Sequence, residues 1–183
     1  MKNLLVVYFS RTGFTRIVAR QLARACHADL EAIDDLQGRS HASGYAQSAF
    51  EALCHQRPLI DRATHTPQDY ALVAVGTPIW MWNMASPVRS YLLRHRGQFQ
   101  RVAFFCTYGG SGSRKVLSDM QTLSGQQAVD TLALRDDDIT ARHFHEPLLR
   151  FSHAIERASR EPVSTGMVPV HPAAGEDAHA FKL

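Results

Sequence analysis

LLVVYFSRTGFT, residues 4–15, joins a short apolar run to a turn rich in hydroxyls, and a helical pattern follows directly. The six apolar residues at its start do not alternate with polar ones, which is typical of a strand buried on both faces of a parallel sheet. Apolar Ile17, Val18, Leu22 and Ala25 then recur at near-helical spacing. The stretch therefore predicts a strand, a loop and a helix in direct succession.

The turn between this strand and helix has the composition of an anion site. Ser10, Thr12 and Thr15 supply hydroxyls, and Gly13 lets the backbone turn sharply and approach a ligand closely. The unpaired N–H groups and the positive dipole end of the helix favour an anion at the same place. The spacing matches neither GxxxxGKS/T nor GxGxxG, so an ATP-type P-loop and a dinucleotide fingerprint are excluded. The alternative is that Thr15 is an ordinary N-cap of the helix.

Length and composition favour one globular domain. The chain has 183 residues, 45% of them hydrophobic and 20% charged, so it can bury a single core. Three cysteines without a CxxC pair favour reduced thiols and a cytoplasmic protein. The N-terminus lacks the pattern of a signal peptide, and no apolar stretch is long enough for a membrane helix. We therefore expect no membrane insertion.

The charge pattern does not favour a nucleic-acid partner. The net charge is +3, and the arginines are spread over several predicted helices. Three of them, Arg16, Arg20 and Arg24, lie four residues apart on one face of the first predicted helix. No nucleic-acid-binding motif accompanies them.

Three other features are assigned no chemistry. His145 and His153 lack the i, i+4 spacing of a helical metal pair, so no metal is predicted. Cys106 is expected to be a core thiol. Residues 136–138, three aspartates, are expected to form a solvated turn without a catalytic role.

Strand and helix patterns alternate along the chain. Further strands are predicted at 28–34, 70–76, 101–107 and 128–134. Later helices are expected to begin at Ser86, as N-cap before Pro87, and at Ser113, and to span about 143–159. This alternation predicts an α/β fold with a parallel sheet covered on both faces, and five strands suit the order 2-1-3-4-5.

Two segments fall outside this pattern. Residues 36–67 form an irregular insertion with a short helix, either a lid beside the ligand or a structural cover for a sheet edge. Residues 161–183 are expected to be an extended tail. The folded domain is therefore placed at residues 1–160.

Two more strand ends are unusual, and the carboxyl ends of parallel strands are where ligands bind. Residues 77–84 contain two tryptophans, two methionines and Asn83, and a flat aromatic ligand would explain such apolar side chains in a loop. Alternatively, Trp80 and Trp82 both pack into the protein body. Residues 107–112 offer glycines, hydroxyls and backbone N–H groups that can bond the edge of a ring.

Together the three strand ends resemble those of the flavodoxin family, whose phosphate loop has the pattern S/T-x-T-G-x-T. The resemblance covers residues 1–159 and is closest to the short type. It implies the flavodoxin-like three-layer sandwich and non-covalent FMN as cofactor. It also implies phosphate contacts from Ser10, Arg11, Thr12, Gly13, Phe14 and Thr15. The implied ring contacts come from Pro78, Ile79, Trp80, Met81, Trp82, Asn83 and Met84, and from Thr107, Tyr108, Gly109, Gly110, Ser111 and Gly112.

Three features depart from that family. Arg11 places a cation in a loop that usually neutralises phosphate with neutral donors. Residues 78–84 contain no glycine, whereas flavodoxins often use a glycine peptide there beside the reactive ring nitrogen. Flavodoxins that act as carriers are usually strongly acidic, and this chain is slightly basic.

The resemblance implies an FMN-binding redox protein that transfers electrons between redox partners. FMN would supply the chemistry, so no catalytic side chain is predicted. An NAD(P)H-dependent FMN-containing quinone reductase, with a small-molecule acceptor, is the alternative favoured by the missing glycine and the absence of an acidic surface. A second alternative is a phosphate-ligand or protein-binding module without redox function, against which the intact set of three loops argues.

Overall fold

A parallel sheet forms the centre of the computed structural model, which describes residues 2–34 and 64–162. In these residues the strand order is β2-β1-β3-β5-β6, and every neighbouring pair on this path is parallel. The strands are β1 (Lys2–Tyr8), β2 (Asp29–Ala32), β3 (Tyr70–Trp80), β5 (Val102–Tyr108) and β6 (Ala128–Arg135). Numbered along the chain, this is the predicted order 2-1-3-4-5.

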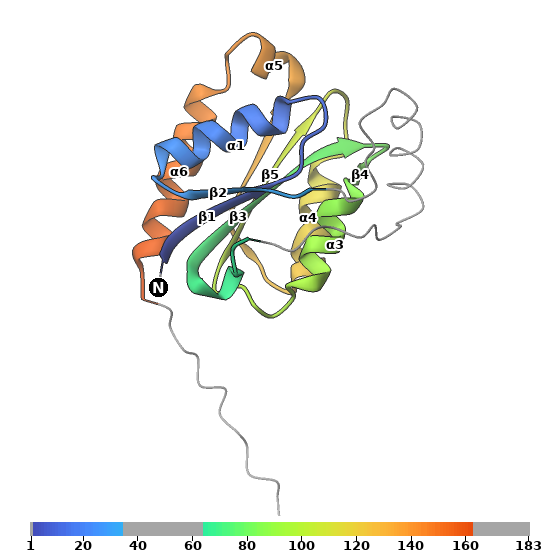
Figure 1. Cartoon of the computed structure of the whole chain (residues 1–183). Helices are drawn as coiled ribbons and strands as arrows, with labels where there is room; N and C mark the ends of the chain where they lie inside the picture. Colours follow the sequence, from blue (N-terminus) through green and yellow to red (C-terminus); the bar gives the residue numbers. More distant parts are fainter. Residues whose placement is uncertain (1, 35–63, 163–183) are drawn as a thin grey trace, which may run out of the picture.

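Helices cover both faces of the sheet, as Figure 1 shows. The helices are α1 (Phe14–Ala25), α3 (Ser86–Arg94), α4 (Ser113–Ser124), α5 (Asp136–Thr140) and α6 (His145–Arg160), with a 3-10 turn η1 (Pro67–Asp69) before β3. α1 and α6 lie on one face, and α3 and α4 lie on the other. The three-layer α/β sandwich is therefore confirmed.

The apolar run in β1 has a direct structural cause. Leu4 and Val6 belong to the core beneath α1 and α6, whereas Leu5 and Val7 belong to the core beneath α3 and α4. Because successive side chains of a strand point to opposite faces, a strand covered on both sides needs an apolar residue at every position. β2, at the edge of the sheet, is only partly buried.

Gly76 allows two central strands to pack at full density. It lies in β3 opposite Phe105 of β5, and a Cβ added there would be 2.1 Å from the Phe105 ring. The phenyl ring therefore occupies the space that any other residue at position 76 would need.

Several predicted boundaries were wrong. The strand predicted at 70–76 continues to Trp80, turns at Met81 and Trp82, and returns as β4 (Asn83–Met84), because Ile79 pairs with Met84. The loop predicted at 77–84 is therefore mostly a β-hairpin.

Helix starts also differ from the prediction. The N-cap of α3 is Ala85 rather than Ser86, although Pro87 lies in the first turn as expected. Residues 136–138 form the first turn of α5 instead of a solvated turn. α6 begins at His145 rather than 143, because Arg142 has a φ of 61° and ends the preceding helix.

Two predicted segments lie wholly or mainly outside the described residues. The irregular insertion at 36–67 is described only from residue 64, and the tail at 161–183 only to residue 162. Within the described ranges, no helix combines the length and the apolar character needed to cross a membrane.

Candidate functional site

The loop between β1 and α1 is organised around Gly13 and Thr15. Gly13 is the N-cap residue of α1 and has a φ of 104°, a left-handed conformation that favours glycine. Thr15 is buried, and its Oγ1 lies 2.9 Å from Oγ1 of Thr107, the penultimate residue of β5. The alternative that Thr15 is the N-cap is therefore wrong; its hydroxyl joins the first strand end to the third.

The same loop leaves polar groups available to a ligand. Among the described residues, the buried Oγ of Ser10 has no hydrogen-bond partner. α1 has no side-chain cap, and its first intrahelical bond runs from the N–H of Ile17 to the carbonyl of Gly13. An unpartnered buried hydroxyl costs about 1–3 kcal/mol, and helix N–H groups favour an anion. An anion in this loop would accept hydrogen bonds from both, as the sequence predicted.

The second strand end is a two-residue turn with an unusual backbone. Met81 and Trp82 have φ values of 46° and 59°, which two-residue hairpins require but glycine and asparagine usually supply. Asn83 Nδ2 donates to the carbonyl of Met81 at 2.8 Å, and Lys115 Nζ donates to Asn83 Oδ1 at 3.2 Å. Side chains from β4 and α4 therefore stabilise a strained turn.

The two tryptophans of this hairpin have different surroundings. Trp80 is buried, with its ring edge-on to Phe9 at a centroid distance of 5.9 Å. Trp82 is 57% exposed and Met81 is 48% exposed. The alternative that both tryptophans pack into the protein body is therefore wrong for Trp82, because more than half of this residue is exposed. Exposed apolar side chains of this size are typical of a binding site.

The third strand end closes against this turn. Trp82 Nε1 donates to Ser111 Oγ at 2.9 Å. Gly112, the N-cap residue of α4, has a φ of 102°, and a Cβ there would lie 3.2 Å from Cα of Trp82. Gly110 has no atom within 4 Å of an added Cβ, so the outer side of this loop is open.

The structure thus brings the three predicted segments to one edge of the sheet, with different degrees of exposure. Thr12, Met81, Trp82 and residues 109–111 are exposed. Arg11, Phe14, Ile79 and Tyr108 are half-buried. Thr15, Pro78, Trp80, Asn83, Met84 and Thr107 are buried.

Asp136 is a residue of this edge that sequence reasoning missed. It follows β6 directly, and a Cβ at Gly109 would lie 3.5 Å from its Oδ2. Its Oδ1 is buried without a hydrogen-bond partner in the described part of the chain. Burial, and secondarily the charge of Asp137, raise the pKa of the Asp136 carboxyl. Three consecutive aspartates gave no sign of which one would be buried.

The described thiols have no reactive environment. Burial raises the pKa of Cys106 to about 12, and burial also raises that of Cys26 to about 12. Cys106 is therefore the core thiol that the sequence predicted. Nor does any group of three His, Cys, Asp or Glu residues in ranges 2–34 and 64–162 form a metal site.

Comparisons with known proteins agree with this architecture. The flavoprotein from Lactobacillus acidophilus, solved in complex with FMN, has a TM-score of 0.61 at 23% identity, covering 78% of this chain and 98% of that one. A flavodoxin from the domain Archaea has a TM-score of 0.54 at 16% identity, covering 88% of this chain and all of that one. Two-electron reduced Megasphaera elsdenii flavodoxin has a TM-score of 0.51 at 15% identity, covering 84% and 98%. At these low sequence identities, the structural likeness shows a shared fold.

Family membership rests on the sequence itself. No curated protein matches the chain. Residues 3–144 match the family model described as flavodoxin, a span that includes all three strand ends. The chain belongs to the flavodoxin family.

Proposed function

We propose that this protein binds FMN non-covalently at the three strand ends and transfers electrons through it. The main support is the buried, unpartnered hydroxyl of Ser10 beside an α1 N-terminus without a side-chain cap. These groups fit a phosphate, which has several strong acceptor oxygens. Membership of the flavodoxin family and the likeness to a flavoprotein solved with FMN support the same cofactor.

The phosphate contacts come from the loop before α1. Ser10 and Thr12 donate hydroxyl hydrogen bonds, and the backbone N–H groups after Gly13 donate to the remaining oxygens. Arg11 adds a positive charge near the phosphate. Thr15 supports this loop rather than binding the phosphate with its side chain, because its hydroxyl is already bonded to Thr107.

The ring contacts come from the other two strand ends. Trp82 covers one ring face with its indole, and the 107–112 loop provides backbone donors for the polar ring edge. Bound FMN supplies the redox chemistry. The residues of this chain position the ring and exclude water from it, while Asn83 and Lys115 keep the β3–β4 turn in place.

An FMN-dependent NAD(P)H oxidoreductase that reduces a quinone is the second candidate. It is favoured by the turn at Met81 and Trp82, where neither residue is glycine although both have positive φ. The net charge of +3 also differs from that of acidic carriers. We retain electron transfer to a redox partner as the first candidate, because the three loops together match flavodoxins best. We also propose a cytoplasmic location, which suits the free thiols Cys26 and Cys106.

One experiment separates these functions. Purified protein is incubated with FMN, desalted and examined for flavin absorbance, and then titrated anaerobically with dithionite. Reduction in two separate one-electron steps supports a carrier. Reduction in a single two-electron step, together with rapid NAD(P)H oxidation in the presence of a quinone, supports a reductase. Absence of bound flavin contradicts both.

A further inference from the structure

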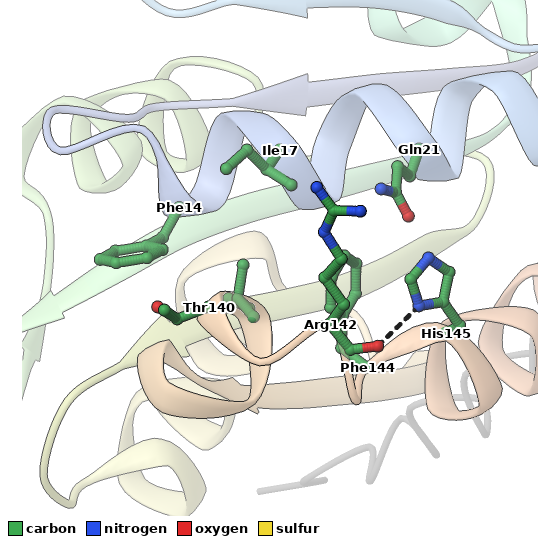
Figure 2. A pocket seen from close by; sticks show the side chains of 8 residues that line it. Phe14, Ile17, Gln21, Thr140, Arg142, Phe144 and His145 are labelled. Atoms are coloured by element: carbon green, nitrogen blue, oxygen red, sulfur yellow. Dashed lines mark hydrogen bonds between the residues drawn. The ribbon is translucent and has the colours of Figure 1, made fainter.

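A hollow lies outside the strand-end edge, between α1, α5 and the start of α6 (Figure 2). Its volume is about 430 Å³, within the range of small-molecule sites. Ile17, Ile139 and Phe144 form apolar walls, and Gln21, Arg142 and His145 contribute polar groups. Ile17 is 43% exposed, which is unusual for a large aliphatic side chain.

Arg142 occupies a backbone position that glycine normally takes. The N–H of Arg142 bonds the carbonyl of Ile139 at 3.2 Å, and the N–H of His143 bonds that of Asp138 at 2.8 Å. This pattern is a Schellman motif, in which the left-handed residue after the helix is usually glycine. Arg142 has a φ of 61°, and a residue with a Cβ is strained in this left-handed conformation.

The strained residue directs its charge over the hollow. In Figure 2 the guanidinium of Arg142 extends toward α1, between Ile17 and Gln21. His145 Nδ1 donates to the carbonyl of Arg142 at 2.9 Å, which orients the imidazole toward the same opening. The guanidinium of Arg142 and the imidazole of His145 therefore both border this hollow.

Among the residues of ranges 2–34 and 64–162 that line this hollow, none carries a carboxylate. In the described ranges, Arg142 has no ion pair and its side chain makes no hydrogen bond. α1 contains no acidic residue, and its exposed Arg16 and Arg20 add positive charge nearby. Asp137 of α5 is paired with Arg135 at 3.5 Å. The hollow thus combines apolar walls with a guanidinium that has no anionic partner in the described part of the chain.

We propose that this hollow binds a small carboxylate with a flat apolar body. The carboxylate bonds the guanidinium of Arg142, whose planar fork suits two carboxylate oxygens, and the apolar body packs against Ile17, Ile139 and Phe144. Of the described residues that line the hollow, Phe14 alone belongs to the loop 10–15 that we propose as the phosphate site. This site is separate from the proposed FMN site and does not depend on it.

Naphthoate is a suitable probe, and its neutral isostere naphthamide is the matched control. Calorimetry of the full chain should give saturable one-to-one binding of naphthoate, and amide NMR shifts should concentrate on α1, α5 and the start of α6. Naphthamide should bind roughly tenfold more weakly or worse, because it lacks a charge-assisted bond to Arg142. Absence of saturable binding, shifts centred elsewhere, or equal binding of both compounds would overturn the proposal.

Variants at position 142 separate binding from folding. R142A should weaken naphthoate binding roughly tenfold or more, and R142K should weaken it less. R142G should bind as poorly as R142A, yet withstand at least as much urea as the parent, because glycine relieves the left-handed strain. Two control variants should bind naphthoate like the parent. R114A changes an exposed arginine on α4, and T12V changes a residue of the phosphate loop. Unchanged binding by R142A and R142G contradicts the assignment.

Discussion

Trp82 Nε1 donates a hydrogen bond to Ser111 Oγ at 2.9 Å, and this bond joins the β3–β4 turn to the loop before α4. Gly112 packs against the backbone of Trp82 on the same side. The two segments that we expect to contact the flavin ring are therefore one unit rather than two independent loops.

This link predicts coupled effects on FMN affinity. Trp82→Phe keeps a ring but removes the donor, and Ser111→Ala removes the acceptor, so each should weaken FMN binding by about 1 kcal/mol. The double variant should be no weaker than the singles, because both remove the same bond. Fluorescence titration with FMN measures all three, and additive losses would contradict the coupling. Unfolding free energies should change by less than about 1 kcal/mol, since Trp82 is exposed.

Ser10→Ala should affect stability and binding in opposite directions. The substitution removes a buried hydroxyl that has no partner in the described residues, so the protein without FMN should be as stable as the parent or more stable. FMN affinity should fall by about 1–2 kcal/mol, because a phosphate hydrogen bond is lost. Urea unfolding and fluorescence titration test the two effects. A loss of stability without FMN would show that Ser10 has a structural partner instead.

The two neighbouring residues of the phosphate loop should differ in importance. Thr12→Val removes a hydroxyl beside the α1 N-terminus and should weaken FMN binding more than Arg11→Ala. The charge of half-buried Arg11 is partly screened by solvent, so its loss should have only a modest effect. Equal FMN retention by both variants would show that the loop is not the phosphate site.

Gly76→Ala should be strongly destabilising. The added Cβ would lie 2.1 Å from the Phe105 ring in the centre of the sheet, which forces the strands or the ring to move. We expect a loss of about 3 kcal/mol or more in the free energy of unfolding. Gly110→Ala is the matched control, because an added Cβ there meets nothing within 4 Å, and it should change stability by less than about 1 kcal/mol. Similar losses in both variants would contradict this packing argument.

Asp136 should make stability depend on pH. Its pKa is raised in the folded state, first by burial and then by Asp137, so the folded protein binds this proton more tightly than the unfolded chain does. The stabilising contribution of the protonated Asp136 carboxyl is full below the pKa that this group has in the unfolded chain. It is lost as the pH rises through the pKa of the same group in the folded protein. The free energy of unfolding of Asp136→Asn should therefore increase relative to that of the parent as the pH rises from acid to neutral. Urea unfolding across this range tests the trend, and a difference that is independent of pH would refute it.

Much of the fold was predictable because the signals are local. The unbroken apolar run from Leu4 to Tyr8 indicated that β1 is covered on both faces of the sheet. Boundaries were wrong where strand pairing decides them and the turn residues do not indicate that pairing. The pairing of Ile79 with Met84 extends β3, and no local pattern announced it.

The sequence by itself determined the α/β class, the strand order and the three segments that meet at one edge of the sheet, since these follow from periodicity, turn residues and the geometry of parallel strands. Only the tertiary structure decided which side chains there are available. Trp80 is buried and Trp82 exposed, Thr15 is bonded to Thr107, and Asp136 alone of three aspartates has a buried oxygen without a partner. Burial and hydrogen-bond partners depend on residues far apart in the chain, and they become defined only when the strands and helices pack together.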